Sequence, residues 1–322
     1  MNKRTFLGFG LMLALPWRAS FSQSRYPDRP VRLVVPFSPG GGGADFTGRL
    51  WAKYAAPLFG GTVVVENKPG AGGAIGAADV ARAQADGYAL LFGSTTTQII
   101  LPAASAKPPY DPKDFALVGI VSVNPTCIIV HRDVPAKSLK DFVALVKASP
   151  GKYVYGSSGA GTITNLAGEI FKLQAGGLDM PHVPYKGGAQ AMQDLIAGHI
   201  PVTMPLLSAD VLAQHRAGRA RILGVNSDVR LKVAPEIPTS IEEGVPDMQV
   251  QVFNAVFAPA ATPRDVLQVL REATLKMRTD GAFLQELHKA GAEPFSQNDE
   301  KFVAEELARW NRVIRAIGFK VQ

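Results

Sequence analysis

Four short loops rich in glycine and hydroxyl side chains carry the residues of this sequence best suited to bind a ligand. Their sequences are SPGGGGAD at residues 38–45, GSTTT at 93–97, GSSGAGT at 156–162 and YKGG at 185–188. The first three follow strand-like runs, and all four precede helix-like runs. Free backbone N–H groups at helix N-termini, together with Ser and Thr hydroxyls, bind anions. These groups suit a small carboxylate without requiring Lys or Arg.

The same loops also have a purely structural explanation. Glycine serves tight turns between strands and helices, and hydroxyl side chains cap helices. For any one loop taken alone, this structural role is the favoured interpretation. We expect two loops in each half of the chain to lie at strand ends that face one cleft, and this grouping favours a binding site.

Other sites built on glycine, serine or histidine do not fit the spacing. Residues 40–43 are not followed by Gly-Lys-Ser/Thr, and GAGGAIG at 70–76 misses the dinucleotide spacing by one residue, so we expect no nucleotide cofactor. The motif of a nucleophile elbow would need glycine where Ala160 stands. The histidines lack the spacing of metal ligands, so we expect neither a metal nor another cofactor.

Strand and helix patterns alternate along the first part of the chain. VRLVVPF, TVVVEN and YALLFGS are runs typical of buried strands, and the segments between them have helical periodicity. This order favours a mainly parallel sheet with right-handed crossovers. We expect Asp45 to cap the first helix, whose apolar side would carry Phe46, Leu50, Trp51 and Tyr54.

Residues 115–130 are interpreted as two strands in close succession, after which a second α/β run begins. Its predicted helices cover 139–148, 163–174, 189–197 and 209–217. A strand at 251–259 then precedes helices at 263–279, 282–290 and 299–317. These last helices lack strands of their own, so we expect them to pack on the first sheet. The prediction is an α/β fold of two lobes, 23–123 with 228–322 and 124–227, with the ligand cleft between them.

The first 22 residues have the three-part pattern of a secretory signal peptide. Lys3 and Arg4 precede an apolar run at 6–15, and small residues fit cleavage before Gln23. The run is shorter than the ~20 residues that span a bilayer. We therefore expect a periplasmic protein whose signal peptide is removed. Removal takes away three basic residues and no acidic one, which lowers the net charge from +7 to about +4.

Composition limits the function further. The 322 residues are 47% hydrophobic and 19% charged, which is typical of a globular protein with a large core. No run of Lys and Arg and no basic–aromatic stripe indicates nucleic acid as a partner. Cys127 is the single cysteine, and its place in an apolar run predicts a buried side chain. We expect a monomer.

Motifs along most of the mature length resemble one known family. They include RPVRLVVPFSPGGGGADFTGRL, VVVENKPGAGGAIGAADVARAQADGYALLFGS, YGSSGAGTITNLAGEIF, HVPYKGGAQAMQDLIAGHI and PEIPTSIEEGVP. The ENKPGAGG, ADGY and PYKG elements are specific in combination. In these features the chain resembles the substrate-binding proteins of tripartite tricarboxylate transporters, the Bug-type receptors. The resemblance implies a two-lobed, type II-like periplasmic binding protein fold that closes on an organic acid and delivers it to integral-membrane transporter subunits, without catalysis.

The resemblance also assigns roles to the loops. The ligand carboxylate would be held by the loop after the first strand and by the loop that opens the second lobe, with 185–188 and 205–207 on the far side. Together with the loop at 93–97, the candidate ligand-binding residues are Ser38, Pro39, Gly40, Gly41, Gly42, Gly43, Asp45, Ser94, Thr95, Ser157, Ser158, Gly159, Ala160, Gly161, Thr162, Asn165, Tyr185, Lys186, Gly187, Pro205 and Leu206.

Two departures from the family pattern lie in the predicted pocket. The family usually has two residues between Pro-Gly-Gly and Asp, whereas three separate Gly41 from Asp45 here. The second-lobe helix often carries His-Leu where this sequence has Asn165–Leu166, and Asn cannot become a cation. Both departures argue against assigning the family's better-known ligands to this chain, and mono-, di- and tricarboxylates stay open.

Apolar residues near the predicted pocket suggest the body of the ligand. Leu206, Leu207 and Phe253 would suit an apolar or aromatic acid, although each could equally belong to the core.

Two alternative functions remain open from sequence. The binding protein could pass its closed shape to a membrane sensor instead of a transporter. An exported hydrolase could use Ser157 or Ser158, provided that a base lies within hydrogen-bond reach.

Overall fold

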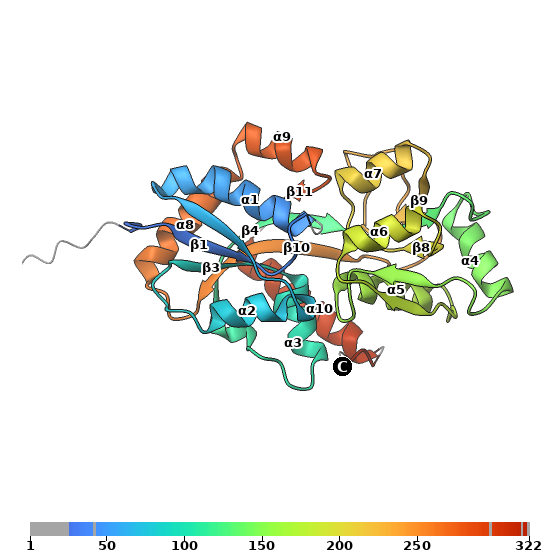
Figure 1. Cartoon of the computed structure of the whole chain (residues 1–322), viewed down its shortest axis with the longest axis horizontal. Helices are drawn as coiled ribbons and strands as arrows, with labels where there is room; N and C mark the ends of the chain where they lie inside the picture. The colour runs from blue at the N-terminus through green and yellow to red at the C-terminus, as the bar shows by residue number, and fades with distance from the viewer. Residues whose placement is uncertain (1–25, 41–42, 296–297, 317, 321–322) are drawn as a thin grey trace, which may run out of the picture.

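The computed structural model describes residues 26–40, 43–295, 298–316 and 318–320, which form two α/β lobes around two sheets (Figure 1). The predicted signal peptide at 1–22, together with Gly41 and Gly42, lies outside the described residues. Within the described part of the chain, no helix has the length and apolar character needed to cross a bilayer.

The first lobe contains a six-stranded sheet with the order β11-β4-β10-β3-β1-β2. Its strands are β1 Val31–Val35, β2 Val63–Asn67, β3 Ala89–Ser94, β4 Phe115–Pro125, β10 Gln251–Pro259 and β11 Glu293–Pro294. The helices that accompany it are α1 Gly43–Ala55, α2 Ala74–Ala81, α3 Leu101–Ala104, α8 Arg264–Met277, α9 Gly281–Lys289 and α10 Asp299–Ala316. Short 3-10 turns occupy Ala56–Phe59, Ala71–Gly73 and Pro112–Asp114, and a π-helix covers Thr96–Ile100.

This sheet is mixed, so the expectation of a mainly parallel sheet was wrong. β1 pairs in parallel with β2 and β3, but β10 pairs antiparallel with both β3 and β4, and β11 pairs antiparallel with β4. The reason is the path of the chain. β4 runs towards the second lobe and leaves the sheet there, so the returning strand β10 must enter from the opposite direction.

The second lobe contains a five-stranded sheet with the order β7-β6-β8-β5-β9. Its strands are β5 Cys127–His131, β6 Tyr155–Ser157, β7 His182–Pro184, β8 Val202–Thr203 and β9 Ala220–Val225. Its helices are α4 Leu139–Ala148, α5 Ile163–Gln174, α6 Gly188–Ile196 and α7 Ala209–Arg216. β5 runs antiparallel to β8 and β9, whereas β6 pairs in parallel with β7 and β8.

Hydrogen bonds join the chain segments that pass between the lobes. Thr126 alone separates β4 from β5, and its backbone N–H donates to the Val250 carbonyl at 2.8 Å. The Asn226 N–H donates to the Thr126 carbonyl at 2.8 Å, and the Asn226 Nδ2 donates to the Thr126 Oγ1 at 2.8 Å. The outgoing and returning segments are therefore tied together where any rotation between the lobes must occur.

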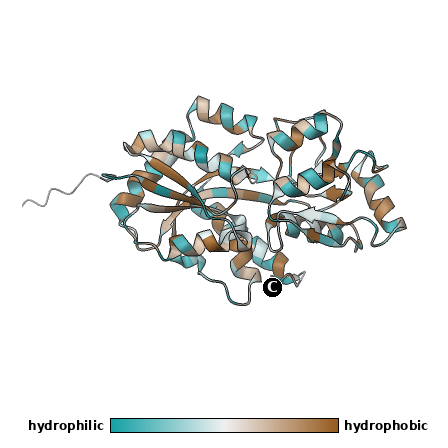
Figure 2. Ribbon diagram, viewed as in Figure 1, coloured by the Kyte–Doolittle hydropathy of each residue, from teal (hydrophilic) through white to brown (hydrophobic). Residues whose placement is uncertain are grey.

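The three C-terminal helices pack on the first lobe, as predicted. α8 contacts α1 and β4, α9 contacts α1, and α10 contacts β4 and α3. The indole Nε1 of Trp51 donates to the hydroxyl of Thr274 at 3.0 Å, so α1 and α8 share a buried polar contact as well as apolar surface. Hydrophobic residues follow the strands of the first sheet between these helices (Figure 2).

Helix capping explains why the second-lobe helices begin where they do. The Ser138 hydroxyl accepts from the Asp141 N–H, and the Asp141 carboxylate accepts from the Ser138 N–H, which forms a capping box for α4. Thr162 caps α5, and Ser208 caps α7. Cys127 is completely buried, as expected, and burial raises the pKa of its thiol.

Candidate functional site

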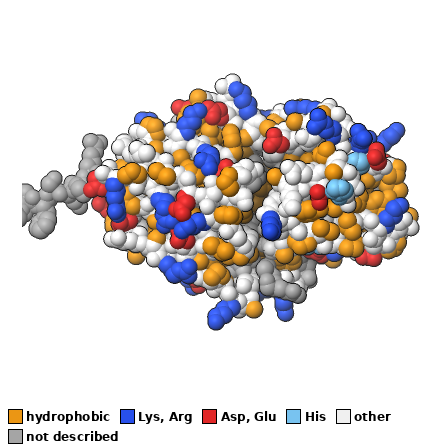
Figure 3. Space-filling model, viewed as in Figure 1, with side chains coloured by type: hydrophobic (Ala, Val, Ile, Leu, Met, Phe, Trp, Pro, Cys, Tyr) orange, Lys and Arg blue, Asp and Glu red, His pale blue; other side chains and the backbone are white. Residues whose placement is uncertain are grey.

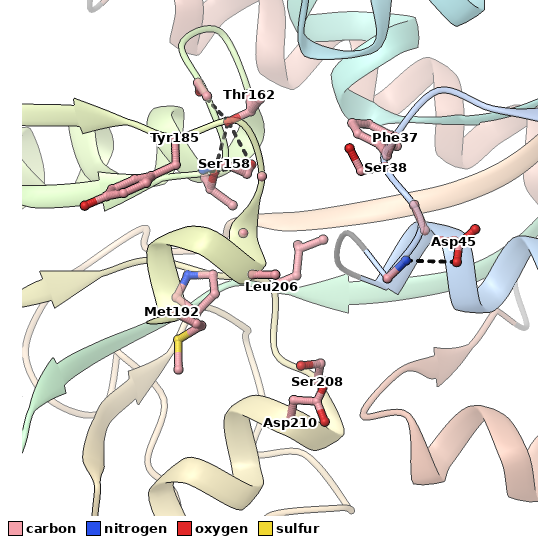
Figure 4. A pocket seen from close by; sticks show the side chains of 18 of the residues that line it. Phe37, Ser38, Asp45, Ser158, Thr162, Tyr185, Met192, Leu206, Ser208 and Asp210 are labelled. Atoms are coloured by element: carbon pink, nitrogen blue, oxygen red, sulfur yellow. Dashed lines mark hydrogen bonds between the residues drawn. The ribbon is translucent and has the colours of Figure 1, made fainter. Parts of the chain in front are cut away.

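A cavity of about 1780 Å³ lies between the two lobes. The surface is hollowed at this junction (Figure 3). Loops at the carboxyl ends of β1, β2 and β3 line it from the first lobe, and loops that follow β6, β7 and β8 line it from the second. Phe37 and Ser38 lie on one side, and Ser158 and Thr162 lie opposite (Figure 4).

Asp45 organises the first-lobe loop. It lies in the first turn of α1, which begins at Gly43, so it is not the N-cap that the sequence predicted. Its Oδ2 accepts a hydrogen bond from the Gly40 N–H at 3.1 Å, and its Oδ1 accepts one from Asn67 Nδ2 at 2.8 Å. The same Asn67 Nδ2 donates to the Phe37 carbonyl at 2.9 Å. The carboxylate and the amide thus hold Gly40 and Phe37, which follow β1.

The charge of Asp45 is stabilised in place. Burial raises the pKa of its carboxyl group, but hydrogen bonds from Arg49, Asn67 and the Gly40 N–H lower the pKa by more than burial raises it. The pKa therefore lies below the usual value. Arg49 Nε lies 3.1 Å from both carboxylate oxygens. Asp45 therefore stays ionised at neutral pH and is already paired, which makes it a positioning group for the loop.

The second-lobe loop contains a cluster of three hydroxyl groups. The Ser158 Oγ lies 3.2 Å from the Thr162 Oγ1 and 2.7 Å from the Thr164 Oγ1, and the Ser158 N–H donates to the Thr164 Oγ1 at 2.9 Å. Gly159 has a φ of +135°, which L residues rarely adopt. This glycine lets the loop turn so that its backbone faces the cavity.

Asn165 supports this loop from behind. Its Oδ1 accepts from the Gly161 N–H at 3.1 Å, and its Nδ2 donates to the Tyr155 hydroxyl at 2.8 Å. Both polar ends of the side chain are therefore used within the lobe. Asn165 therefore fixes the shape of the loop from within the lobe.

Ser157 has a histidine partner that the sequence did not indicate, because the two residues are far apart in the chain. The Ser157 Oγ lies 2.7 Å from His182 Nε2, although 25 residues separate them in the chain. Ser157 is 1% exposed and is not among the residues that line the cavity. The His182 ring stacks on Tyr155 with 4.8 Å between ring centroids. The pair joins β6 to β7 beneath the loop.

Burial lowers the pKa of His182, and this predicts acid sensitivity. The folded state favours the neutral ring, whereas the unfolded chain binds a proton once the pH falls below about 6.5. The contribution of neutral His182 to the free energy of unfolding is therefore fully present above that pH. It declines as the pH falls towards the lowered pKa of the folded state. We expect the melting temperature to decrease when the pH is lowered from 7.5 to 5. The decrease should be smaller in His182→Gln.

The wild type must be compared with His182→Gln because burial also lowers the pKa of His215, which adds a similar pH dependence to both proteins. Subtracting the two pH profiles isolates His182. Identical profiles for the wild type and His182→Gln would contradict the prediction.

The far side of the cavity is more apolar. Tyr185, Met192 and Leu206 line it, and the Tyr185 hydroxyl is turned outwards to Asp194, to which it donates at 2.8 Å. Leu207 and Phe253 are completely buried in the core, so of the three apolar residues considered from sequence, Leu206 alone lines the cavity.

Most of the sequence-predicted residues meet around this cavity. Those that line it are Ser38, Gly40, Asp45, Ser94, Ser158, Gly159, Ala160, Thr162, Tyr185, Lys186, Gly187, Pro205 and Leu206. Of the other described candidates, those outside the lining are Pro39, Thr95, Ser157, Gly161 and Asn165. Thr95 turns away because its Oγ1 accepts from the Phe253 N–H at 3.0 Å. Gly43 begins α1, and Gly41 and Gly42 lie outside the described residues.

Sequence reasoning missed several residues that line the cavity. Phe46 was expected on the apolar side of α1, but it is 43% exposed and borders the cavity. The loop at 70–73 was considered as a dinucleotide motif, yet it lines the same cavity beside the loops after β1 and β3. A useful signal was available here, because this glycine-rich loop follows β2 and precedes α2. Asn254, in the middle of β10, carried no such signal.

The described residues show no group of three or more His, Cys, Asp or Glu placed to hold a metal ion. The polar groups around the cavity include hydroxyls, amides and backbone N–H groups, which can bind an anion by hydrogen bonds.

The chain is similar to known proteins in sequence and in fold. The model of the tripartite tricarboxylate transporter family receptor matches residues 48–319. The chain is 36% identical to a UPF0065 protein of Bordetella pertussis over 301 residues, 92% of each protein.

Solved structures are similar over nearly the whole chain. The periplasmic binding protein BugD superposes with a TM-score of 0.84 at 31% identity, covering 92% of this chain and 100% of BugD. The R. palustris protein Rpa4515 with adipate superposes with a TM-score of 0.86 at 30% identity, covering 92% of this chain and 99% of Rpa4515.

Proposed function

The chain belongs to the tripartite tricarboxylate transporter family of receptors, and from this premise we propose that it binds a small organic carboxylate in the cavity between its lobes. It would do so in the periplasm and deliver the acid to the membrane subunits of a tripartite-type transporter. The adipate found with Rpa4515 supports a carboxylate as the ligand class.

The observation that carries this proposal is the pair of facing loops. Ser38 and Asp45 lie across the cavity from Ser158 and from Thr162, the N-cap of α5. Backbone N–H groups at a helix start carry partial positive charge and favour an anion. The hydroxyl protons of the Ser158 cluster can rotate, because two of its contacts allow either oxygen to donate.

Basic side chains around the cavity add to this preference. Lys186, Arg219 and Lys289 line it, and within the part of the chain that the structure describes none of them forms a salt bridge. Asp210 also lines the cavity without a salt bridge among the described residues, so three such cations stand against one such carboxylate, and this balance favours an anion. Arg49, by contrast, is already bound to Asp45.

A serine hydrolase is the second candidate, because Ser157 and His182 form a close pair. We propose that the pair is structural. Ser157 is buried beneath the loop and also exchanges hydrogen bonds with Gly159, so a substrate carbonyl in the cavity would meet Ser158 first. Hydrolysis of p-nitrophenyl acetate that is lost in Ser157→Ala would refute this part of the proposal.

We further propose how the rest of the chain serves this function. Residues 1–22 direct export and are removed. Residues 23–123 with 228–322 form one lobe, and 124–227 form the other, in a monomer. The lobes close on the ligand by rotation about the segments that contain Thr126, Asn226 and Val250. A sensor-coupled role for the same ligand would use the same closure, and neighbouring genes for transporter subunits or for a sensor kinase would distinguish the two roles.

Thermal unfolding of the purified protein with a panel of acids tests the ligand class. We expect one class among mono-, di-, tri- and aromatic carboxylates to raise the melting temperature, because a ligand that binds only the folded state stabilises it. At a concentration 100 times its Kd, the gain is about 2.7 kcal/mol. Neutral sugars and organic amines at the same concentration serve as controls. If the control compounds raise the melting temperature and no carboxylate does, the proposal is wrong.

A further inference from the structure

The floor of the cavity contains a polar pair that the carboxylate-binding loops do not use. Ser94 is the last residue of β3, and Asn254 lies directly opposite it on the antiparallel strand β10. Directly opposed residues on such strands point to the same face, with Cβ atoms ~5 Å apart. Both residues line the cavity, yet they are only 3% and 1% exposed.

Both side chains keep unused hydrogen-bonding capacity. Among the described residues, neither the Ser94 Oγ nor the Asn254 Oδ1 has a hydrogen-bond partner. This is unusual, because buried polar groups in folded proteins are nearly always paired. It also points to a ligand, since these two atoms belong to residues at the wall of a binding cavity.

Contacts behind Asn254 set the direction of its amide. Its Nδ2 donates to the Ser122 Oγ at 3.2 Å and to the Asn124 Oδ1 at 3.1 Å, both on β4. The Ser122 hydroxyl also donates to that Asn124 oxygen. Because the NH₂ group is held by acceptors on the β4 side, the carbonyl oxygen of Asn254 is the part left for a ligand.

The backbone of Ser94 is held equally firmly. Its N–H donates to the Thr97 hydroxyl at 2.9 Å, and its carbonyl accepts from the same hydroxyl at 3.2 Å. The neighbouring Thr96 lines the cavity, and its Oγ1 accepts from the Ile163 N–H in the first turn of α5. The backbone that carries the Ser94 side chain is therefore fixed, and its neighbour Thr96 contacts the second lobe.

The two atoms together fit a hydroxyl group. An acceptor next to a Ser hydroxyl, which can both donate and accept, is satisfied by a group that donates one hydrogen bond and accepts another. A carboxylate would place its oxygen lone pairs against the Asn254 carbonyl. An ammonium group would be buried with only neutral acceptors, because the nearby Asp45 is already paired with Arg49, and such burial is costly.

We propose that Ser94 and Asn254 form a subsite for a hydroxyl group of the ligand, so that the receptor selects hydroxylated carboxylates over their deoxy analogues. The inference rests on the proposed function, since the facing loops would hold the carboxylate while Ser94 and Asn254 form hydrogen bonds with the ligand hydroxyl. A site built to pair a substrate hydroxyl discriminates strongly against an analogue that lacks it.

Calorimetric titration with matched acids tests the subsite. The pairs are malate with succinate, 3-hydroxybutyrate with butyrate, and 3-hydroxyadipate with adipate, and aspartate serves as the amino counterpart of malate. We expect the hydroxylated member of at least one pair to bind tenfold or more tightly to the wild type, roughly the effect of one well-placed hydrogen bond. In Ser94→Ala that ratio should fall several-fold, because one of the two partners of the ligand hydroxyl is deleted while the Asn254 carbonyl oxygen remains.

Two control variants separate this effect from others. Thr262→Val removes another buried hydroxyl that has no partner among the described residues, but it lies outside the cavity and should leave every affinity unchanged. Ser38→Ala should weaken both members of a pair and keep their ratio. Because the Ser94 Oγ has no protein partner among the described residues, Ser94→Ala should melt at the wild-type temperature, which a structural role for the hydroxyl would not allow.

The titrations distinguish failure of the hydroxyl subsite from failure of the proposed receptor function. If carboxylates bind but the hydroxyl makes no difference in any pair, if the preference is undiminished in Ser94→Ala, or if aspartate binds more tightly than malate, the subsite is wrong and the receptor function stands. If no acid of any kind binds, the proposed function fails and the subsite fails with it.

Discussion

Gly159→Val is expected to weaken carboxylate binding by about 100-fold, which corresponds to about 2.8 kcal/mol of binding free energy. Gly159 lines the cavity with a φ of +135°, and a Cβ placed there would lie 3.3 Å from the Tyr185 carbonyl oxygen. A valine must therefore either adopt a strained backbone conformation or move the loop, and strain of this kind costs about 1–3 kcal/mol. Calorimetric titration with the acid that gives the largest thermal shift measures the loss.

Two other glycines of the same lobe serve as matched controls. Gly187 also lines the cavity, but its backbone is extended and open space surrounds its missing Cβ, so Gly187→Val should keep affinity within a few fold. Gly177 has a φ of +78° and lies outside the cavity lining, so Gly177→Val should lower stability without lowering affinity. Wild-type affinity in Gly159→Val would exclude this loop from the binding site.

Asp45→Ala is expected to produce the second large effect, a loss of about 30-fold in affinity together with about 1–3 kcal/mol of folding free energy. The substitution removes the acceptor for the Gly40 N–H and for Asn67 Nδ2, and it leaves Arg49 without its carboxylate. The turn before α1 then loses the contacts that set its shape. Urea unfolding and calorimetric titration measure the two losses separately.

Asp265 provides the comparison for Asp45. It also lies in the first turn of a helix, α8, but it is exposed and outside the cavity, so Asp265→Ala should leave binding unchanged. An Asp45→Ala protein that loses stability but binds with wild-type affinity would show that this carboxylate supports the fold alone. Such a result would contradict its proposed role in positioning the loop.

Local sequence signals predicted the helices well. α4 and α5 were predicted residue for residue, and β10 likewise, because each has a clear boundary in the sequence. Ser138 and Thr162 are hydroxyl residues immediately before the apolar helical runs, and their side chains do cap these helices. Signals of this kind depend on neighbours within one helical turn, so a single sequence contains them.

Contacts between distant segments could not be predicted in the same way. The antiparallel direction of β10 follows from its return from the other lobe, and periodicity carries no information about strand direction. The approach of His182 to Ser157 and of Asn254 to Ser94 depends on sheet register. Phe46 has the spacing of a core residue, and its exposure follows from the position of the first turn of α1 above the cavity.

The path of β10 has a consequence for the order in which the protein folds. All five strands of the second sheet come from one continuous stretch of chain, whereas β3 and β4 become joined only when β10 inserts between them. Pairing of distant segments is slow because loop closure costs entropy. During synthesis and export, the second lobe can therefore assemble first, while β3 and β4 still present unpaired edges. These edges are the part of the newly made chain most exposed to aggregation, and the arrival of residues 251–259 ends that exposure.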